Sequence, residues 1–128
     1  SIMKKLLVLL FSILISFNSY GDWTYQGDSV SGNTNYLDMD TIREHSGYVY
    51  FWTLIDYLKP NEYGDMSSKM YTQGDCGVYR IKYLSFTHSK QPMGKGGETN
   101  NPPNPEWIYP TPGGGIDYDL SLVCQYVK

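Results

Sequence analysis

The sequence contains little of the chemistry that metal sites need. Only two of its 128 residues are histidine and only two are cysteine. Neither His45 nor His88 has a second histidine or a cysteine at ligand spacing, and a zinc site needs three or four such ligands. Asp38 and Asp40 lack the further oxygen ligands and the glycine of a calcium loop. We therefore expect no metal ion and no other cofactor.

Catalytic motifs are missing as well. The segment "MGKGG", residues 93–97, lacks the spacing and the serine or threonine of a phosphate-binding loop, so we expect it in a hairpin loop. Asp117 and Asp119 could do acid and base work, but they also suit the first turn of a helix. Other serines and aspartates are scattered in predicted turns, where capping and turn chemistry explain them. The sequence predicts a protein that is not an enzyme.

Positive charge and long apolar runs are also scarce. Ten basic side chains stand against 13 acidic ones, which gives a net charge of −3. A net negative charge disfavours binding to nucleic acid or to an anionic membrane, because both rest on a positive field. The longest apolar run, Leu6 to Ile15, contains a single polar residue, Ser12, and is shorter than the roughly 18 residues that a membrane span requires.

The apolar run follows two lysines and precedes small residues, an order that is typical of a secretory signal peptide. We expect residues 1–21 to be the signal peptide and residues 22–128 to form one domain. Export would place this domain in the periplasm or at the outer cell surface. Because Asp22 rather than a cysteine follows the expected cut, we expect no lipid anchor. An uncleaved membrane anchor is the alternative, which the short run disfavours.

Aromatic and turn-forming residues are plentiful. Thirteen tyrosines, three tryptophans, 13 glycines and seven prolines are typical of a domain rich in strands and turns. The strongest predicted strand is Tyr48 to Tyr57, and both of its faces are apolar. We expect it to be central and covered on both sides, either by the protein's own elements or by a partner chain. Further strands are predicted at 22–26, 36–37, 68–75 and 78–87.

The connecting segments give weaker signals. Asp40 is predicted to cap one helical turn that ends near Gly47. Residues 89–105 have no periodicity and are predicted to form a long mobile loop. The segment "EWIYP", residues 106–110, is predicted to be a short strand or an anchor. From residue 116 onward, apolar residues at helical spacing favour a helix, although an alternating pattern keeps a strand as the competing prediction.

The two cysteines predict a disulfide. In an exported chain with only Cys76 and Cys124, the pairing is obvious, because oxidising compartments keep disulfides. The bridge would close a loop of about 49 residues and contribute on the order of 4 kcal/mol to stability. A redox-active or nucleophilic thiol is the alternative, but it lacks a C-x-x-C motif and a nearby histidine.

A local basic stretch follows Cys76 and supplies the candidate binding residues. These are Arg80, Lys82, Lys90 and Lys95, flanked by Tyr79 and Tyr83. Alternation predicts Tyr79 and Tyr83 on one face of the strand and Arg80 and Lys82 on the other. In a net-acidic protein such a stretch fits a contact site for a protein or an anion. A solvated strand face followed by a flexible loop is the alternative.

Several short motifs occur in a characteristic order. They are a tryptophan near the expected mature start, "YLDMDTIR", "LIDY", "SSKMYTQGDC", a strand with Arg80, "MGKGG", "EWIYP" and a final "VC". This combination resembles the surface-adhesin protein E family of Gram-negative bacteria. The resemblance implies an α+β fold, a single antiparallel sheet of about six strands with a C-terminal helix packed on its concave face and tethered by the disulfide.

The resemblance also implies a role in binding. The adhesin after which the family is named attaches to host extracellular-matrix and serum proteins and can pair with itself. The resemblance therefore implies a protein partner and allows a homodimer. A periplasmic module that binds a small molecule or an envelope component in an aromatic-lined concavity under the helix is the alternative. A periplasmic inhibitor of a host or competitor enzyme is a third hypothesis.

Overall fold

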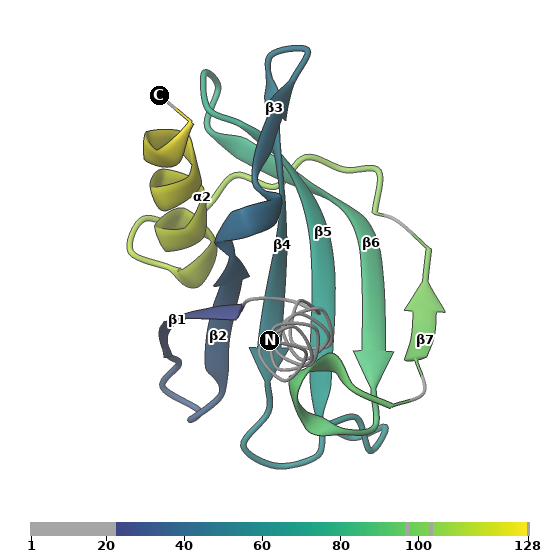
Figure 1. The fold of residues 1–128 in the computed structure, drawn as a ribbon. Coiled ribbons are helices and arrows are strands. Elements are labelled where there is room, and N and C mark those ends of the chain that lie inside the picture. Colours follow the sequence, from purple (N-terminus) through teal and green to yellow (C-terminus); the bar gives the residue numbers. More distant parts are fainter. Residues whose placement is uncertain (1–22, 97, 103, 128) are drawn as a thin grey trace, which may run out of the picture.

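The computed structural model describes residues 23–96, 98–102 and 104–127. The predicted signal peptide lies outside these residues. The described chain forms one antiparallel sheet with the strand order β1-β2-β4-β5-β6-β7, and β3 pairs with the start of β4 beside this path (Figure 1). The strands are β1 (Trp23–Asp28), β2 (Thr34–Asp38), β3 (Arg43–His45), β4 (Tyr48–Asp56), β5 (Ser67–Asp75), β6 (Arg80–Ser89) and β7 (Glu98–Asn101). The α+β fold with a single antiparallel sheet is confirmed.

The strand β4 is central, as its composition predicts. It pairs with β5 along its whole length and with β2 and β3 on its other edge. Val49 and Phe51 are buried, whereas Tyr50 and Trp52 on the other face are half-buried. The two faces therefore differ, and only one of them belongs to the core that the helix covers.

The C-terminal segment is a helix, α2 (Gly115–Tyr126), which confirms the prediction from its apolar spacing. Leu120 and Val123 are fully buried and pack in one cluster with Leu37, Val49, Phe51 and Ile81. A methyl group added at Gly74 would stand 2.8 Å from the side chains of Leu120 and Val49. Gly74 therefore lets α2 approach the sheet closely.

Two contacts fasten the turn between β5 and β6 to α2. Cys76 forms the predicted disulfide with Cys124, with their Cα atoms 5.8 Å apart. The Tyr79 hydroxyl donates a hydrogen bond to the Asp117 carboxylate in the first turn of the helix. Asp117 and Cys124 are seven residues apart, which is about two helical turns, so both lie on the same side of α2.

One local prediction, the cap at Asp40, is wrong. Asp38 caps the short 3-10 turn η1 (Met39–Thr41), and its carboxylate accepts a hydrogen bond of 3.1 Å from the Asp40 amide. The chain then enters β3 instead of continuing as a helix to Gly47. The positive φ of 84° at Gly47 allows the tight turn that folds β3 back onto β4.

The long loop predicted at residues 89–105 contains regular structure. A 3-10 turn, η2 (Pro92–Gly94), follows β6, and β7 then pairs antiparallel with the end of β6. An edge strand has a strand partner on one side only, so polar residues suffice to form it. The sequence did not predict β7 because its residues, ETNN, have no apolar alternation.

Candidate binding surfaces

The sheet face opposite α2 carries a row of aromatic side chains. Trp52 is opposite Tyr71 in the β4–β5 register, and directly opposed residues share a face. The Tyr71 ring lies 4.9 Å from the Trp52 ring and 6.1 Å from the Tyr50 ring. All three side chains are half-buried. We call the surface formed by the following residues the aromatic face: Arg43, Tyr48, Tyr50, Trp52, Tyr71, Arg80, Lys82 and Trp107.

Two of the predicted binding residues, Arg80 and Lys82, lie over the ring of Trp107. The Arg80 guanidinium carbon lies 4.1 Å from the centre of its ring and the Lys82 Nζ 4.4 Å from it. Tyr48 packs on the same tryptophan with ring centres 5.8 Å apart. A cation over an aromatic face is attracted by roughly 0.5–2 kcal/mol. The cluster therefore places two cations on a preformed aromatic base, and one of them, Arg80, is also ion-paired with Asp75.

The segment that carries Trp107 is anchored to β6. The neighbouring Ile108 exchanges two backbone hydrogen bonds with Ile81, at 2.9 and 2.8 Å. Ile108 packs against the core under the helix, and the alternation of side chains along an extended segment then directs Trp107 to the opposite face. The predicted anchor at residues 106–110 is confirmed in this form.

Arg80 is held in place from the strand side. Its Nε donates to the Asp75 carboxylate at 3.2 Å, and its side chain is 24 % exposed. The same carboxylate accepts hydrogen bonds from the amides of Gly77 and Val78, both at 3.1 Å. The Val78 amide and then Arg80 lower the pKa of Asp75. The anionic form of Asp75 therefore shapes the β5–β6 turn and orients the guanidinium.

Arg43 supplies a third cation at another part of the aromatic face. Its guanidinium donates a hydrogen bond of 2.9 Å to the Tyr71 hydroxyl and lies 5.9 Å from the centre of the Tyr50 ring. The Gln73 amide donates to the Tyr50 hydroxyl at 3.2 Å. These contacts keep the aromatic rings and the guanidinium in one arrangement before any partner binds.

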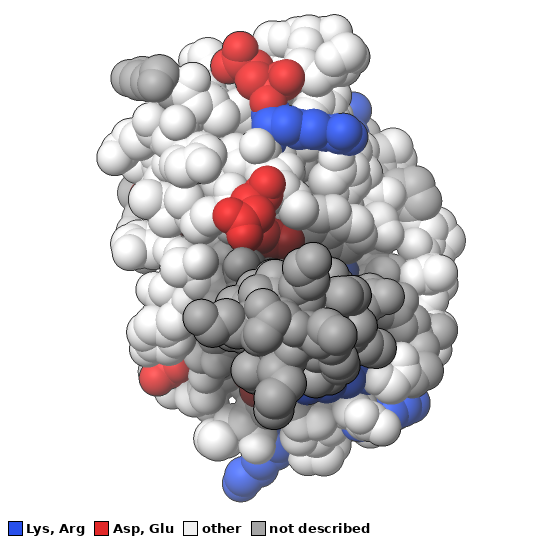
Figure 2. Space-filling view, in the orientation of Figure 1, with Lys and Arg blue, Asp and Glu red and all other residues white. Residues whose placement is uncertain are grey.

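The structure separates the other predicted binding residues from this cluster. Tyr79 and Tyr83 lie on the helix side of the sheet, where Tyr79 bonds to α2 and burial raises the pKa of Tyr83. Lys90 and Lys95 follow the far end of β6, and the ten residues of β6 span about 30 Å. On the face shown in Figure 2, basic side chains lie near the top and toward the bottom rather than in one patch.

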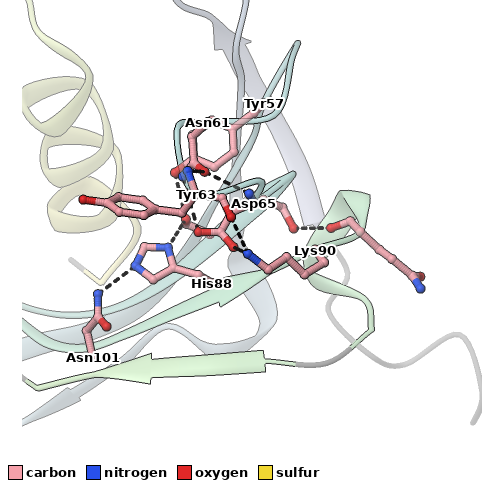
Figure 3. Close-up of polar contacts among 10 residues, drawn as sticks. Tyr57, Asn61, Tyr63, Asp65, His88, Lys90 and Asn101 are labelled. Carbon is pink, nitrogen blue, oxygen red and sulfur yellow. Dashed lines mark hydrogen bonds and ion pairs between the residues drawn. The ribbon is translucent and has the colours of Figure 1, made fainter.

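Lys90 belongs to a polar network of its own (Figure 3). Its ammonium group forms a 2.9 Å ion pair with Asp65, whose side chain is 8 % exposed, and this contact lowers the pKa of Asp65. Beside the pair, His88 bonds through one ring nitrogen to Ser68 at 2.7 Å and through the other to Asn101 at 2.9 Å. Lys90 is thus paired within the protein, although its own side chain is 58 % exposed.

The "MGKGG" segment does not form a phosphate cradle. The Met93 amide donates to the Asp56 carboxylate at 2.9 Å, and the Gly94 amide donates to the Ser67 hydroxyl at 2.8 Å. A phosphate-binding loop must keep such amides free for its ligand. Here they attach η2 to the ends of β4 and β5, as expected for a structural loop.

Two further findings concern the described residues only. Within them, no three histidine, cysteine, aspartate or glutamate side chains lie close enough together to hold a metal ion. None of the helices in that part of the chain is long and apolar enough to span a membrane.

Comparisons with known proteins agree with this fold. The family model described as surface-adhesin protein E matches residues 23–125, and the chain therefore belongs to that family. Crystal form II of Haemophilus influenzae protein E superposes with a TM-score of 0.61 at 17 % identity, covering 73 % of this chain and 83 % of that one. The selenomethionine form of the same protein gives 0.57 at 16 % identity, covering 79 % and 85 %. No curated protein matches the chain.

These two likenesses establish the fold alone, because identity is low. The family is one of surface adhesins, which supports a binding role rather than catalysis. The sequence predicts Arg80 and Lys82 as binding residues, but it does not predict their contact with Trp107. Nor does it predict the contacts of Arg43 with Tyr50 and Tyr71. One signal for Trp107 is present in the sequence, because it lies within the predicted short strand or anchor at residues 106–110, which needs a strand to attach to.

Proposed function

We propose that the protein is an exported, non-enzymatic, protein-binding domain of adhesin type and that the aromatic face is its contact surface. The observation that carries this proposal is the pair of cations, Arg80 and Lys82, stacked on Trp107. Tryptophan, tyrosine and arginine are the residues most enriched at the energetic centres of protein interfaces. A preordered surface of these residues costs little entropy on binding.

The charge of this surface indicates the kind of partner. Three cations on the aromatic face of a chain with net charge −3 favour an acidic patch on a folded protein. Membership of an adhesin family supports host matrix or serum proteins as the partner class. The proposal places the mature domain in the periplasm or at the outer cell surface, without a lipid anchor.

A solid-phase binding assay against a panel of immobilised host matrix and serum proteins tests the proposal. For any partner bound by the unmodified protein, we expect Trp107→Ala to weaken binding about thirty-fold, the effect of a 2 kcal/mol hot spot. Lys82→Glu should weaken it as well and should flatten its salt dependence, because it removes a cation from the contact.

The matched control is Tyr126→Ala, which removes an aromatic side chain that is 55 % exposed on α2. Its affinity should equal that of the unmodified protein. Thermal unfolding of every variant separates loss of binding from loss of fold. Unchanged affinity in both Trp107→Ala and Lys82→Glu would remove the aromatic face from the proposal.

A homodimer is the second candidate, and the specific observation that favours it is the half-buried row of Tyr50, Trp52 and Tyr71, which no helix of the described chain covers. Sizing by light scattering, with and without the Trp107→Ala change, tests it. A dimer that dissociates in the variant would assign the face to self-association; a monomer would leave it to a different protein.

A further inference from the structure

A groove runs between α2 and the sheet, on the side opposite the aromatic face. One hollow of about 410 Å³ lies at its mouth, between the β1–β2 turn and Gly113–Gly115. A second, of about 290 Å³, lies over β4 beneath the start of the helix. Asn35, Gly115 and Asp119 line both, so the hollows adjoin. Together they have the size of a site for a small organic molecule.

The groove carries negative charge and no positive charge. Asp28 and Asp119 line it, and no lysine, arginine or histidine of the described chain does. Within the described residues the Asp119 carboxylate makes no hydrogen bond and no ion pair. Tyr83 from β6 lines the groove with Asp119. Asp119 is half-buried, and a carboxylate partly withdrawn from water is normally stabilised by a nearby cation, which the described residues do not supply here.

A second polar group in the groove is also without a partner. The Thr72 side chain is 1 % exposed, and its hydroxyl oxygen has no hydrogen-bond partner. Thr72 lines the deep end of the groove together with Asp119 and Ile116. Natural proteins rarely leave buried hydroxyls unsatisfied, and such a group needs an explanation. The space beside Thr72 is only about 10 Å³, too small for a ligand, so Thr72 marks the closed end of the groove and is not a contact of the proposed site.

The rest of the lining is apolar and the entrance is open. Ile55, Met70 and Ile116 line the inner hollow beside the Tyr83 ring. At the mouth, a methyl group added at Gly113 or Gly115 would meet no atom within 4 Å. The glycines before the helix therefore leave room for a ligand to enter.

We propose that this groove binds a small organic ammonium compound with an apolar body. The ammonium group would pair with the Asp119 carboxylate next to the Tyr83 ring, which attracts cations through its π face. The apolar body would lie on Ile55, Met70 and Ile116. This site is separate from the aromatic face and does not depend on the adhesin proposal.

Calorimetric titration at pH 8 with 2-phenylethylammonium and with 2-phenylethanol tests the proposal. The two probes share size and apolar body and differ in charge. We expect the ammonium to bind at least ten times more tightly than the alcohol. Asp119→Asn, which keeps the shape of the side chain, should reduce this ratio to about one. Gly115→Leu, which places a side chain in the mouth, should weaken both probes.

The control Trp107→Ala should leave both affinities unchanged, because Trp107 lies on the other side of the sheet. A loss of amine binding there would place the probe on the aromatic face and overturn the assignment. The proposal also fails if the unmodified protein binds neither probe at tens of millimolar concentration, or if Asp119→Asn keeps its preference for the ammonium. Failure of the adhesin assay would leave this result untouched.

Discussion

The carboxyl of Asp119 shows how burial changes the chemistry of one residue. Removal from water raises its pKa from 3.8 to about 7, because the groove offers no cation to the ionised form. Between these two values the unfolded chain releases a proton that the folded chain keeps. The contribution of Asp119 to the free energy of unfolding therefore falls as the pH rises from about 4 to about 7.

We expect Asp119→Asn to remove this loss. Below about pH 4 the two proteins should depend on pH in the same way, because the Asp119 carboxyl of the unmodified protein is then protonated in both the folded and the unfolded chain. At pH 8 the variant should be more stable, by at most about 4 kcal/mol and by less where water enters the groove. Urea unfolding at pH 4 and at pH 8 measures the difference. Equal stability of the two proteins at pH 8 would contradict the expected cost of the buried charge.

Asp117 provides a control of opposite sign two residues away. Its pKa is lowered, first by the hydrogen bond from Tyr79 and then by the Gly113 amide. Its contribution to stability is therefore present above pH 4 and is lost as the pH falls. Asp117→Asn should be less stable than the unmodified protein at pH 8, and the gap should narrow in acid. A stabilising effect at pH 8 would show that position 119 is not special.

At the scale of elements, the attachment of α2 depends on the β5–β6 turn. The bridge between Cys76 and Cys124 constrains the unfolded chain and fastens the helix, whose Leu120 and Val123 are buried against the sheet. We expect Cys124→Ser to lower the free energy of unfolding by about 2–5 kcal/mol. Urea unfolding measures the loss, and Cys76→Ser should reproduce it. An unchanged midpoint in either variant would mean that core packing alone holds the helix.

Asp65 lies just before β5 and Lys90 just after β6, and their ion pair can be tested with a matched pair of lysine variants. Both lysines are exposed, but Lys90 forms an ion pair with the largely buried Asp65, whereas Lys95 forms no salt bridge within the described part of the chain. We expect Lys90→Gln to lower the melting temperature at pH 7 and Lys95→Gln to leave it unchanged. The effect of Lys90→Gln should shrink as the pH falls below about 4 and through the lowered pKa of Asp65, because the carboxyl then takes up a proton and the ion pair is lost.

Equal melting temperatures of the two lysine variants at pH 7 would show that the Asp65 ion pair is not structural. In that case Lys90 would be available to a partner, as the sequence suggested for the whole basic stretch. Even then Lys90 would not join the cluster at Trp107, because β6 begins at Arg80 and ends just before Lys90, so its full length separates the two side chains.

At the scale of the whole molecule, one sheet presents two different surfaces. The helix covers the side that holds Asp119 and the groove, and the aromatic face lies on the other side. The two proposed sites can therefore be changed independently. Variants at Trp107 and at Asp119 should not affect one another, and additive effects on stability in the double variant would confirm the separation.

Much of this arrangement follows from local pattern. The alternation in Tyr48 to Tyr57 and in the segment after Cys76 predicts both the strands and the faces of Arg80 and Tyr83. The spacing of apolar residues after residue 116 predicts the helix, and two cysteines in an exported chain leave one pairing. The strands and the helix follow from the spacing of apolar residues along the chain, and the disulfide follows from the pairing of cysteines in an oxidising compartment. Both can be read from the order of residues alone.

Only the tertiary structure decided which of these residues meet. Trp107 joins Arg80 and Lys82 because Ile108 pairs with Ile81 across a long sequence separation. The sequence predicts Asp119 only as a residue of the first helical turn. Its carboxyl is partly removed from water because α2 packs over the sheet. The physical reason is the same in both cases: burial and contact between distant segments are set by the packed fold, whereas local periodicity reports only the elements that are packed.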